Sequence, residues 1–324
     1  MVDIASIEAA ARRLDGVSVR TPLLRSFELD RLAGGPVLVK PECMQVIGAF
    51  KIRGAYNRLS QLTAEEAARG VVAWSSGNHA QGVAAAAAML GIRAAIVMPE
   101  DAPRAKLENT RRLGGEVITY DRYTGDREAI ARQVAAERGA ALVPSYDHEQ
   151  IIAGQGTVGL EIADDALALD CPPDQVLIPC GGGGLSSGSA VALKSGLPGV
   201  SVYGVEPVAF DDTARSMLSG QRERIDPEAR SICDALQSPS PGKLTFDINR
   251  RLLAGVLTVS DDEVREAIRF AFRHLKLVLE PGGAVALAAL LTGKLESQDK
   301  TTAIVLSGGN IDVDLFAEIQ AEPT

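Results

Sequence analysis

The sequence lacks the features that would direct it to a membrane or to a nucleic acid. Its first residues include acids and contain no basic segment followed by an apolar core, so we expect no secretory signal. The longest strongly apolar run, residues 83–90, is mostly alanine and too short to cross a bilayer. No basic run offsets the net charge of -9, and binding to nucleic-acid phosphates needs clustered Lys and Arg. We therefore expect neither a membrane nor a nucleic-acid partner.

The four cysteines (Cys43, Cys171, Cys180 and Cys233) are scattered and include no Cys-x-x-Cys pair. This spacing predicts free thiols in a reducing cytoplasm rather than disulfides or zinc ligands. Cys180 precedes a glycine run and is therefore the candidate for a place near a ligand. The competing interpretation is a small buried apolar residue, which is the commoner role of a free cysteine.

What the sequence does contain is an alternation of short apolar strands and helices. One series has expected strands at residues 70–74, 94–98, 116–120 and 141–143. A second has them at 175–179, 201–205, 256–259 and 303–306. Strands separated by helices of this length predict right-handed βαβ crossovers and parallel sheets. The segment 221–249 is less regular and is expected to wrap the surface.

We therefore predict an α/β fold with two doubly wound parallel-sheet domains and a cleft between them. The small domain would comprise residues 71–146, and the large domain residues 1–70 together with 147–324. In open α/β sheets, ligands bind where strands end and helices begin. Nothing after Asn310 is large enough for a regulatory domain.

A run of four glycines follows the expected strand at 175–179: Gly181, Gly182, Gly183 and Gly184. Without Cβ atoms, consecutive backbone N–H groups can converge on an anion at the N-terminus of the next helix. This pattern predicts a phosphate-bearing ligand, and a flexible turn is the alternative. A dinucleotide fingerprint fails because Ser186 stands where Gly or Ala is required, and no Gly-Lys-Ser/Thr follows. A small cofactor with one phosphate remains.

Lys51 lies in the stretch 48–55 (GAFKIRGA), just before an amphipathic helix pattern. Most such lysines are solvated cations, and a minority are amine nucleophiles that form a Schiff base. Ser307 follows the last expected strand in a Ser-Gly-Gly-Asn turn. A reactive lysine, a phosphate loop and a hydroxyl for the ring nitrogen are together the minimal protein complement of pyridoxal 5′-phosphate.

These motifs resemble the serine/threonine dehydratase and serine racemase family, in the tryptophan synthase β-like fold type II of pyridoxal-phosphate enzymes. The resemblance extends from Thr21-Pro22-Leu23 to the turn at 307–310. It rests on the stretches 40–42 (KPE), 48–55 (GAFKIRGA), 75–82 (SSGNHAQG), 152–157 (IAGQGT), 181–185 (GGGGL) and 306–310 (LSGGN).

The resemblance implies a role for each matching residue. Lys51 would carry the cofactor and remove the substrate α-proton, while Phe50 would pack on one face of the cofactor ring. Asn78 would bond the ring's phenolic oxygen, and Ser307 would face its nitrogen. The phosphate would be held by Gly181, Gly182, Gly183, Gly184 and the Leu185 amide. A hydroxyl rather than a carboxylate at the ring nitrogen favours prompt β-elimination.

The implied substrate loop consists of Ser75, Ser76, Gly77, Asn78 and His79, which would bind the substrate carboxylate. Ser76 matches the acid/base residue that serves racemases on the opposite ring face, and a carboxylate ligand is its alternative role. The stretch 206–212 resembles the family's divalent-cation site. Glu206 and Asp212 would supply carboxylate oxygens and Phe210 a carbonyl, a set that suits Mg²⁺ or Ca²⁺. A strand-end acid and a helix-capping acid are the alternative.

The implied activity is an ammonia-lyase (dehydratase) that converts L-threonine, L-serine or a close β-hydroxy amino acid to a 2-oxo acid and ammonia. A 3-hydroxyaspartate dehydratase and a serine racemase are the alternatives within the family, and a nicotinamide oxidoreductase or a non-catalytic sensor are the alternatives outside it. The family also suggests a cytoplasmic homodimer or dimer-based tetramer. Ile47 and Ala49 replace the usual Thr and Ser, and Ala235 replaces a common Gly, which leaves the substrate side chain open.

Overall fold

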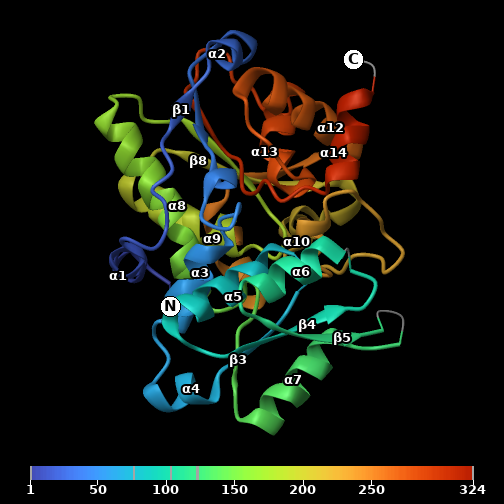
Figure 1. Cartoon of the computed structure of the whole chain (residues 1–324). Coiled ribbons are helices and arrows are strands. Elements are labelled where there is room, and N and C mark those ends of the chain that lie inside the picture. Colours follow the sequence, from blue (N-terminus) through green and yellow to red (C-terminus); the bar gives the residue numbers. More distant parts are fainter. Residues whose placement is uncertain (1, 76, 103, 122–123, 323–324) are drawn as a thin grey trace.

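The computed structural model describes residues 2–75, 77–102, 104–121 and 124–322, and two β-sheets organise it (Figure 1). The strands of the larger sheet are β1 (Leu24–Arg25), β2 (Val37–Lys40), β7 (Gln175–Pro179), β8 (Ser201–Pro207), β9 (Gly255–Val259) and β10 (Thr302–Val305), in the order β1-β2-β10-β7-β8-β9. Those of the smaller sheet are β3 (Val71–Trp74), β4 (Ala94–Pro99), β5 (Glu116–Tyr120) and β6 (Ala141–Leu142), in the order β5-β4-β3-β6.

The helices divide between the two sheets according to their place in the sequence. The first and last parts of the chain contribute α1 (Ile4–Leu14), α2 (Phe27–Ala33), α3 (Lys51–Leu59), α8 (Glu149–Ala168), α9 (Gly184–Gly196), α10 (Asp212–Ser219), α11 (Lys243–Leu252), α12 (Asp261–Phe270), α13 (Pro281–Leu291) and α14 (Val313–Ala321). The middle part contributes α4 (Ala64–Arg69), α5 (Asn78–Leu90), α6 (Arg104–Arg112) and α7 (Arg127–Arg138).

The predicted architecture of two α/β domains is confirmed, with one correction at the edge of the larger sheet. Every strand pair is parallel except β1 with β2, where Leu24 lies opposite Val39 in antiparallel register. An antiparallel edge strand on an otherwise parallel sheet is common in such folds. The domain boundaries at residues 70 and 147 remain a prediction.

Local sequence signals set many of the helix ends. Ser260 and Glu263 form a reciprocal capping box at the start of α12, as Thr63 and Glu66 do at α4. At its C-terminus, α5 ends on Gly91 in the left-handed conformation with φ of 67°. The residues that determine these ends are adjacent in the chain, so the signals are local.

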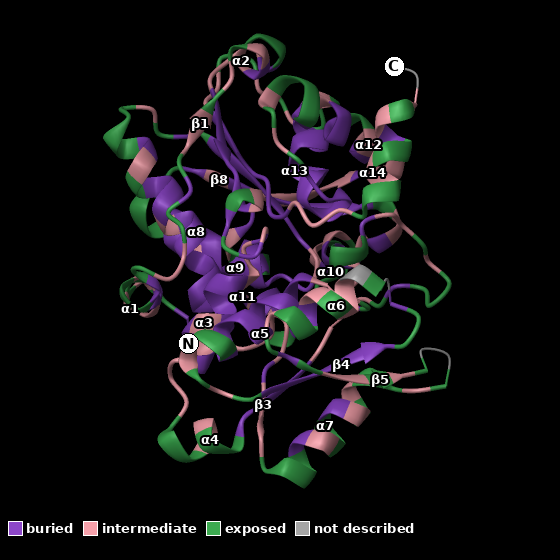
Figure 2. Ribbon diagram, viewed as in Figure 1, coloured by how far each residue is buried: buried purple, intermediate pink, exposed green. Residues whose placement is uncertain are grey.

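Helix α13 lies at the centre of the larger domain and is buried from Pro281 through Leu290 (Figure 2). Pro281 is suited to the first helical turn, where its missing N–H costs no hydrogen bond. The helix packs on α12 and against strands of the larger sheet, in the core that also holds Leu177 and Ile304. The turn before α13 is thereby fixed at the edge of the cleft.

The close crossing of α8 and α9 positions the glycine loop. A Cβ on Gly188 would lie 2.2 Å from the carbonyl oxygen of Ile152, so a side chain there would force the helices apart. Because the backbones approach this closely, the N-terminus of α9 at Gly184 is held against the body of the larger domain.

The expectation of irregular structure over residues 221–249 is wrong at its C-terminal end, where α11 begins. The carboxylate of Asp147 accepts hydrogen bonds from the N–H groups of Lys243 and Leu244 at 2.9 and 2.8 Å. These contacts satisfy orphan donors of the helix N-terminus. Asp147 lies 96 positions before Lys243 in the sequence, so no local sequence pattern predicts the start of this helix.

Within the described residues, no helix combines the length and apolarity needed to cross a bilayer.

Candidate active site

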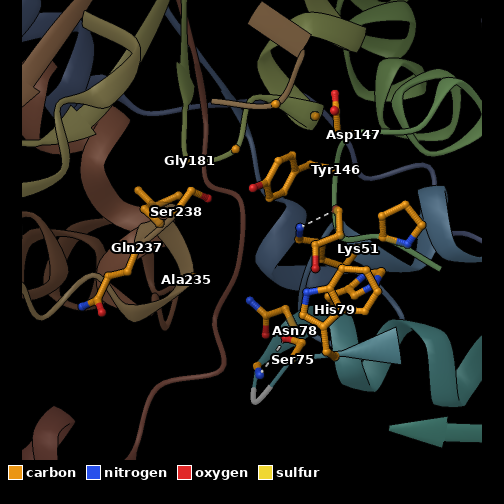
Figure 3. A pocket seen from close by; sticks show the side chains of 18 of the residues that line it. Lys51, Ser75, Asn78, His79, Tyr146, Asp147, Gly181, Ala235, Gln237 and Ser238 are labelled. Carbon is orange, nitrogen blue, oxygen red and sulfur yellow. Dashed lines mark hydrogen bonds between the residues drawn. The ribbon is translucent and has the colours of Figure 1, made fainter. Parts of the chain in front are cut away.

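A cavity of about 850 Å³ lies between the two sheets and is lined by residues of both. It brings together nearly all of the predicted site, namely Phe50, Lys51, Ser75, Gly77, Asn78, His79, Gly181, Gly182, Gly183, Gly184, Leu185 and Ser307. Ser76 lies outside the described residues. In Figure 3, Lys51, Asn78 and His79 face Ala235, Gln237 and Ser238 across the cavity.

Lys51 is the first residue of α3, directly after Phe50. Its Nζ donates a hydrogen bond to the carbonyl oxygen of Ser145 at 3.1 Å and lies 5.2 Å from the centroid of the Phe50 ring. Desolvation lowers the pKa of the Lys51 amine to about 8. The lowered pKa makes the neutral amine, which is the nucleophilic form, more accessible near physiological pH.

The glycine loop has no space for side chains at two of its positions. A Cβ on Gly182 would lie 2.3 Å from ring atoms of Tyr146, and Gly183 has a φ of 92°. The loop leads directly into the N-terminus of α9, where backbone N–H groups lack intrahelical partners. This arrangement fits a phosphate group. Tyr146 was not predicted as a site residue.

A buried carboxylate, also missed by the sequence analysis, fixes the orientation of Asn78. Asn78 Nδ2 donates to Glu280 Oε1 at 2.5 Å, and Asn310 Nδ2 donates to Asn78 Oδ1 at 2.8 Å. Burial and the charge of Asp234 raise the pKa of Glu280 to about 7. The available signal was an acid placed directly before Pro281 at the start of a wholly apolar helix.

The loop that follows β3 leads into the N-terminus of α5, and a hydrogen bond joins two of its described residues. Ser75 Oγ accepts from the N–H of Gly77 at 3.1 Å, and α5 starts at Asn78. His79 Nε2–H donates to the carbonyl of Val143 at 2.9 Å. Desolvation and the Lys51 charge lower the pKa of His79 to about 3, so the imidazole is neutral. The described part of the loop therefore offers a helix N-terminus and the Ser75 hydroxyl, which suit a carboxylate.

The turn at 307–310 is joined to the lysine segment. The N–H of Phe50 donates to the carbonyl oxygen of Ser307 at 3.2 Å, and Ala49 pairs with Gly308 in an isolated bridge. Ile47 and Ala49 are buried and lie outside the cavity lining among the described residues. Two of the three positions where the chain departs from the family pattern therefore lie behind the cavity wall, whereas the third, Ala235, lines the cavity.

A cluster of four buried charged side chains anchors α3 through Arg53. Arg53 donates to Glu42 at 2.8 Å and to Glu161 at 2.7 Å, and Lys40 donates to Glu161 at 2.6 Å. Arg53 is two residues from Lys51 on the same helix. Two cations thus face two carboxylates, and we call Lys40, Glu42, Arg53 and Glu161 the balanced cluster.

A second buried group contains only acids. Glu206 accepts from the N–H groups of Thr213 and Ala214 at 3.1 and 3.0 Å, which satisfies the capping interpretation for this residue. Both side-chain oxygens of Asp212 lack a hydrogen-bond partner among the described residues. Desolvation raises the pKa of Glu206 to about 8 and that of Asp212 to about 7, and the Asp212 charge adds to the shift at Glu206. We call Glu206 and Asp212 the acidic pair.

The predicted cation ligands thus lie in one region, and Phe210 is buried beside them. Among the described residues, no group of three or more His, Cys, Asp or Glu side chains could hold a metal ion. A cation here would need backbone carbonyls or water besides the acidic pair.

Cys180 is a small buried residue. Its Sγ lies 3.4 Å from Ser186 Oγ and 3.5 Å from Thr213 Oγ, and burial raises the pKa of its thiol. The competing expectation that it lies near a ligand is not supported, since it is absent from the cavity lining within the described residues. All four cysteines are free.

Comparisons with known proteins agree with this geometry. The family model described as pyridoxal-phosphate dependent enzyme matches residues 15–308. An L-threo-3-hydroxyaspartate ammonia-lyase of a Pseudomonas species is 44% identical over 310 residues, covering 96% of this chain and 96% of that protein. An L-threonine ammonia-lyase of Thermotoga maritima is 41% identical over 319 residues, covering 98% and 78%. The structure of maize serine racemase matches with a TM-score of 0.92 at 37% identity, covering 98% and 96%.

Proposed function

Because the chain belongs to the family of pyridoxal-phosphate dependent enzymes, we propose that it is an ammonia-lyase that converts a β-hydroxy amino acid to a 2-oxo acid and ammonia. The observation that carries this proposal is that Lys51, whose amine has a lowered pKa, lines the same cavity as a glycine loop without side chains. The relatives named for ammonia-lyase activity on 3-hydroxyaspartate and threonine support it.

The residues of the cavity fit pyridoxal 5′-phosphate. Lys51 would hold the cofactor covalently, Phe50 would cover its ring, and the Asn78 amide would orient it. The phosphate would bind to the amides of residues 181–185, and Ser307 would face the ring nitrogen. When bound, the cofactor supplies the electron sink that acidifies the substrate α-proton.

The protein's own groups would carry the remaining steps. The loop after β3 would bind the substrate carboxylate at the N-terminus of α5, which orients the α-proton toward Lys51. The Lys51 amine would then act as the general base, for which a pKa of about 8 is well placed. Ser76 would contact the carboxylate or act as a second acid/base. In the second role the chain would also racemise serine, in line with its likeness to maize serine racemase.

We further propose that the acidic pair, with the carbonyl of Phe210, binds Mg²⁺ or Ca²⁺. The two orphaned oxygens of Asp212 support this, because a buried carboxylate without a donor is costly and a hard cation would compensate it. None of these three residues lines the cavity within the described part of the chain, so the cation would stabilise the large domain and take no part in chemistry.

A homodimer or a dimer-based tetramer in the cytoplasm is also proposed. Several large apolar side chains, among them Phe27 and Val313, are more than three-quarters exposed, as in a surface covered by another subunit. The four free cysteines suit a reducing compartment.

The test is the visible spectrum of the purified protein, combined with 2-oxo acid assays on L-threonine, L-serine and L-threo-3-hydroxyaspartate. We expect a yellow protein, loss of bound colour and of all turnover in Lys51→Ala, and retained colour in Lys106→Ala, the control at the second lysine of the cavity. Assays of both serine enantiomers report racemisation. A colourless wild-type protein, or colour that persists in Lys51→Ala, contradicts the proposal.

A further inference from the structure

Helix α11, which packs against α9, also contacts the glycine loop from outside the cavity (Figure 2). Its Thr245 and Asn249 are both fully buried and, four residues apart, lie on one face of the helix. Neither belongs to the described cavity lining, so neither would touch a ligand there. A Cβ on Gly183 would lie 2.9 Å from Thr245 Oγ1 and 3.0 Å from Asn249 Nδ2. These two side chains therefore form the back wall of the glycine loop.

The carbonyl oxygen of Gly182 is held by two donors at the start of α11. It accepts from the Thr245 hydroxyl at 2.6 Å and from the N–H of Gly242 at 3.2 Å. In a planar trans peptide the carbonyl oxygen and the N–H point in opposite directions. The N–H of Gly183, which belongs to the same peptide, therefore points away from α11. It has no acceptor among the described residues, and Gly183 lines the cavity, so this donor is available to a ligand.

The peptide that joins Gly182 to Gly183 needs such a restraint. Glycine enters backbone regions that other residues avoid, and Gly183 already has a φ of 92°. A peptide between two glycines can therefore flip at little steric cost, which exchanges the places of its N–H and its carbonyl oxygen. The flipped peptide would present an oxygen, and not a donor, to a bound phosphate. The hydrogen bond from Thr245 opposes this flip because it requires the carbonyl oxygen to stay on the side of α11.

The next peptide of the loop is restrained by α9 itself. The carbonyl oxygen of Gly183 accepts from the N–H of Ser187 at 2.9 Å, which is a helical backbone bond. It also accepts from the Ser186 hydroxyl at 3.1 Å, and that hydroxyl in turn accepts from Asn249 Nδ2 at 3.0 Å. The side chains thus add a second bond to a peptide that the helix already orients. The carbonyl of Gly182 lies before the helix and depends on α11.

We infer that Thr245 is a positioning residue for the phosphate of the cofactor: its hydroxyl holds the 182–183 peptide so that the Gly183 N–H faces the phosphate. The inference rests on the proposed binding of pyridoxal 5′-phosphate and assigns a role to a residue that would not touch it. Hydrogen bonds from N–H groups to phosphate are charge-assisted, so the direction of this one donor affects affinity more than a bond between neutral groups would.

The experiment titrates the full chain, freed of cofactor, with pyridoxal 5′-phosphate and with pyridoxal, which has the same aldehyde and ring but no phosphate. The visible band of the bond to Lys51 gives both dissociation constants. Thr245→Val and Thr245→Ala remove the hydroxyl with different changes of shape, and Thr245→Ser keeps it. The matched control is Thr110→Val, which removes a fully buried hydroxyl that donates to the carbonyl of Lys106 at 3.0 Å in the other domain.

We expect Thr245→Val and Thr245→Ala to bind pyridoxal 5′-phosphate roughly 3- to 10-fold more weakly than wild type, the range for one net hydrogen bond. Their affinity for pyridoxal should stay within about twofold, because pyridoxal has no group for the Gly183 N–H to bind. Thr245→Ser and Thr110→Val should keep the wild-type ratio of the two constants. Ser186→Ala should lose less than Thr245→Val, since the N–H of Ser187 still holds the carbonyl of Gly183.

Three results would overturn the inference: equal losses for pyridoxal 5′-phosphate and pyridoxal in the variants without the hydroxyl, a loss in Thr110→Val as large as theirs, or a Thr245→Ser protein no better than Thr245→Val. If wild type gives no visible band with either compound, the proposed function fails instead. Calorimetry with inorganic phosphate then decides the inference. Weaker binding by Thr245→Val than by wild type supports it, and no difference between the two proteins overturns it.

Discussion

The larger domain buries two groups of charged side chains that differ in composition. The balanced cluster places two cations against two carboxylates, and Arg53 alone reaches Glu42, Glu161 and Thr157 at 2.7 to 3.1 Å. The acidic pair has two carboxylates and, at Asp212, no hydrogen-bond donor among the described residues. Burial is similar in both groups, so the difference lies in how the charge is compensated.

The comparison separates a structural role from a binding role. Charges that find all their partners inside the protein can be buried without any ligand, and here they brace the helix that begins at Lys51. Carboxylates buried without a cationic partner hold their protons more tightly: desolvation raises the pKa of both Glu206 and Asp212, and the Asp212 charge adds to the shift at Glu206. A divalent cation would turn the second group into the electrostatic equivalent of the first.

The largest expected effect comes from breaking the balanced cluster. Arg53→Met leaves Glu42 and Glu161 buried with Lys40 as their remaining cation, and we expect a loss of about 3–5 kcal/mol in the free energy of unfolding. Urea denaturation measures it. The control is Arg20→Met, which removes an ion pair between Arg20 and Asp165. The Arg20 side chain is 53% exposed, so this change should lower the free energy of unfolding by less than about 1 kcal/mol. Similar losses in the two variants would contradict the comparison.

The next effect concerns the acidic pair and has the opposite sign. At a cation concentration one hundred times the dissociation constant, Mg²⁺ or Ca²⁺ should stabilise wild type by about 2.7 kcal/mol. Asp212→Asn should abolish this response and, in EDTA, should leave the protein as stable as wild type or more so, because it removes a buried repulsion. Urea denaturation with and without cation measures both quantities.

The control for this experiment is Asp211→Asn, which removes a neighbouring carboxylate that forms an ion pair with Arg215 at 2.8 Å. This variant should keep the cation response. A response that survives in Asp212→Asn would place the cation elsewhere, and marked destabilisation of Asp212→Asn in EDTA would assign Asp212 a structural role without metal.

The sequence predicted the parts of this molecule that are encoded locally. Lys51 and residues 181–184, which line the same cavity, could be singled out because a lysine before a helix and glycines after a strand are local patterns. Glu280 and Tyr146 were missed because their roles depend on contacts with Asn78 and Gly182, which are distant in sequence. The start of α11 was missed for the same reason, since its capping carboxylate belongs to Asp147.

His148 shows the same limit at a single residue. A lone histidine between two acids gives no local sign of burial, but it is half-buried and lines the cavity. Its Nδ1 accepts from the N–H of Gln150 at 3.1 Å and caps α8. Desolvation lowers its pKa, which keeps Nδ1 available as an acceptor. Only the folded structure shows that the His148 side chain caps the N-terminus of α8.

The smallest expected effect tests whether charge pairing stabilises the balanced cluster. Burial alone would raise the pKa of Glu42, but the Arg53 guanidinium outweighs it and the pKa lies below the ordinary value of 4.5. A carboxyl whose folded pKa is depressed contributes stability that is present above its unfolded pKa and is lost as the pH falls through the folded one. The difference in unfolding free energy between wild type and Glu42→Gln should therefore be largest above about pH 5.5 and should shrink toward about pH 3.5.

Urea denaturation across this pH range measures the trend, with Thr157→Val as the control. The Thr157 hydroxyl accepts from Arg53 at 3.1 Å but does not titrate, so the loss caused by its removal should be the same at every pH at which the protein folds. If the Glu42→Gln difference is equally flat, the ionised form of Glu42 adds nothing to stability. The balanced cluster would then be held by hydrogen bonding and packing alone, and its contrast with the acidic pair would rest on geometry rather than on charge.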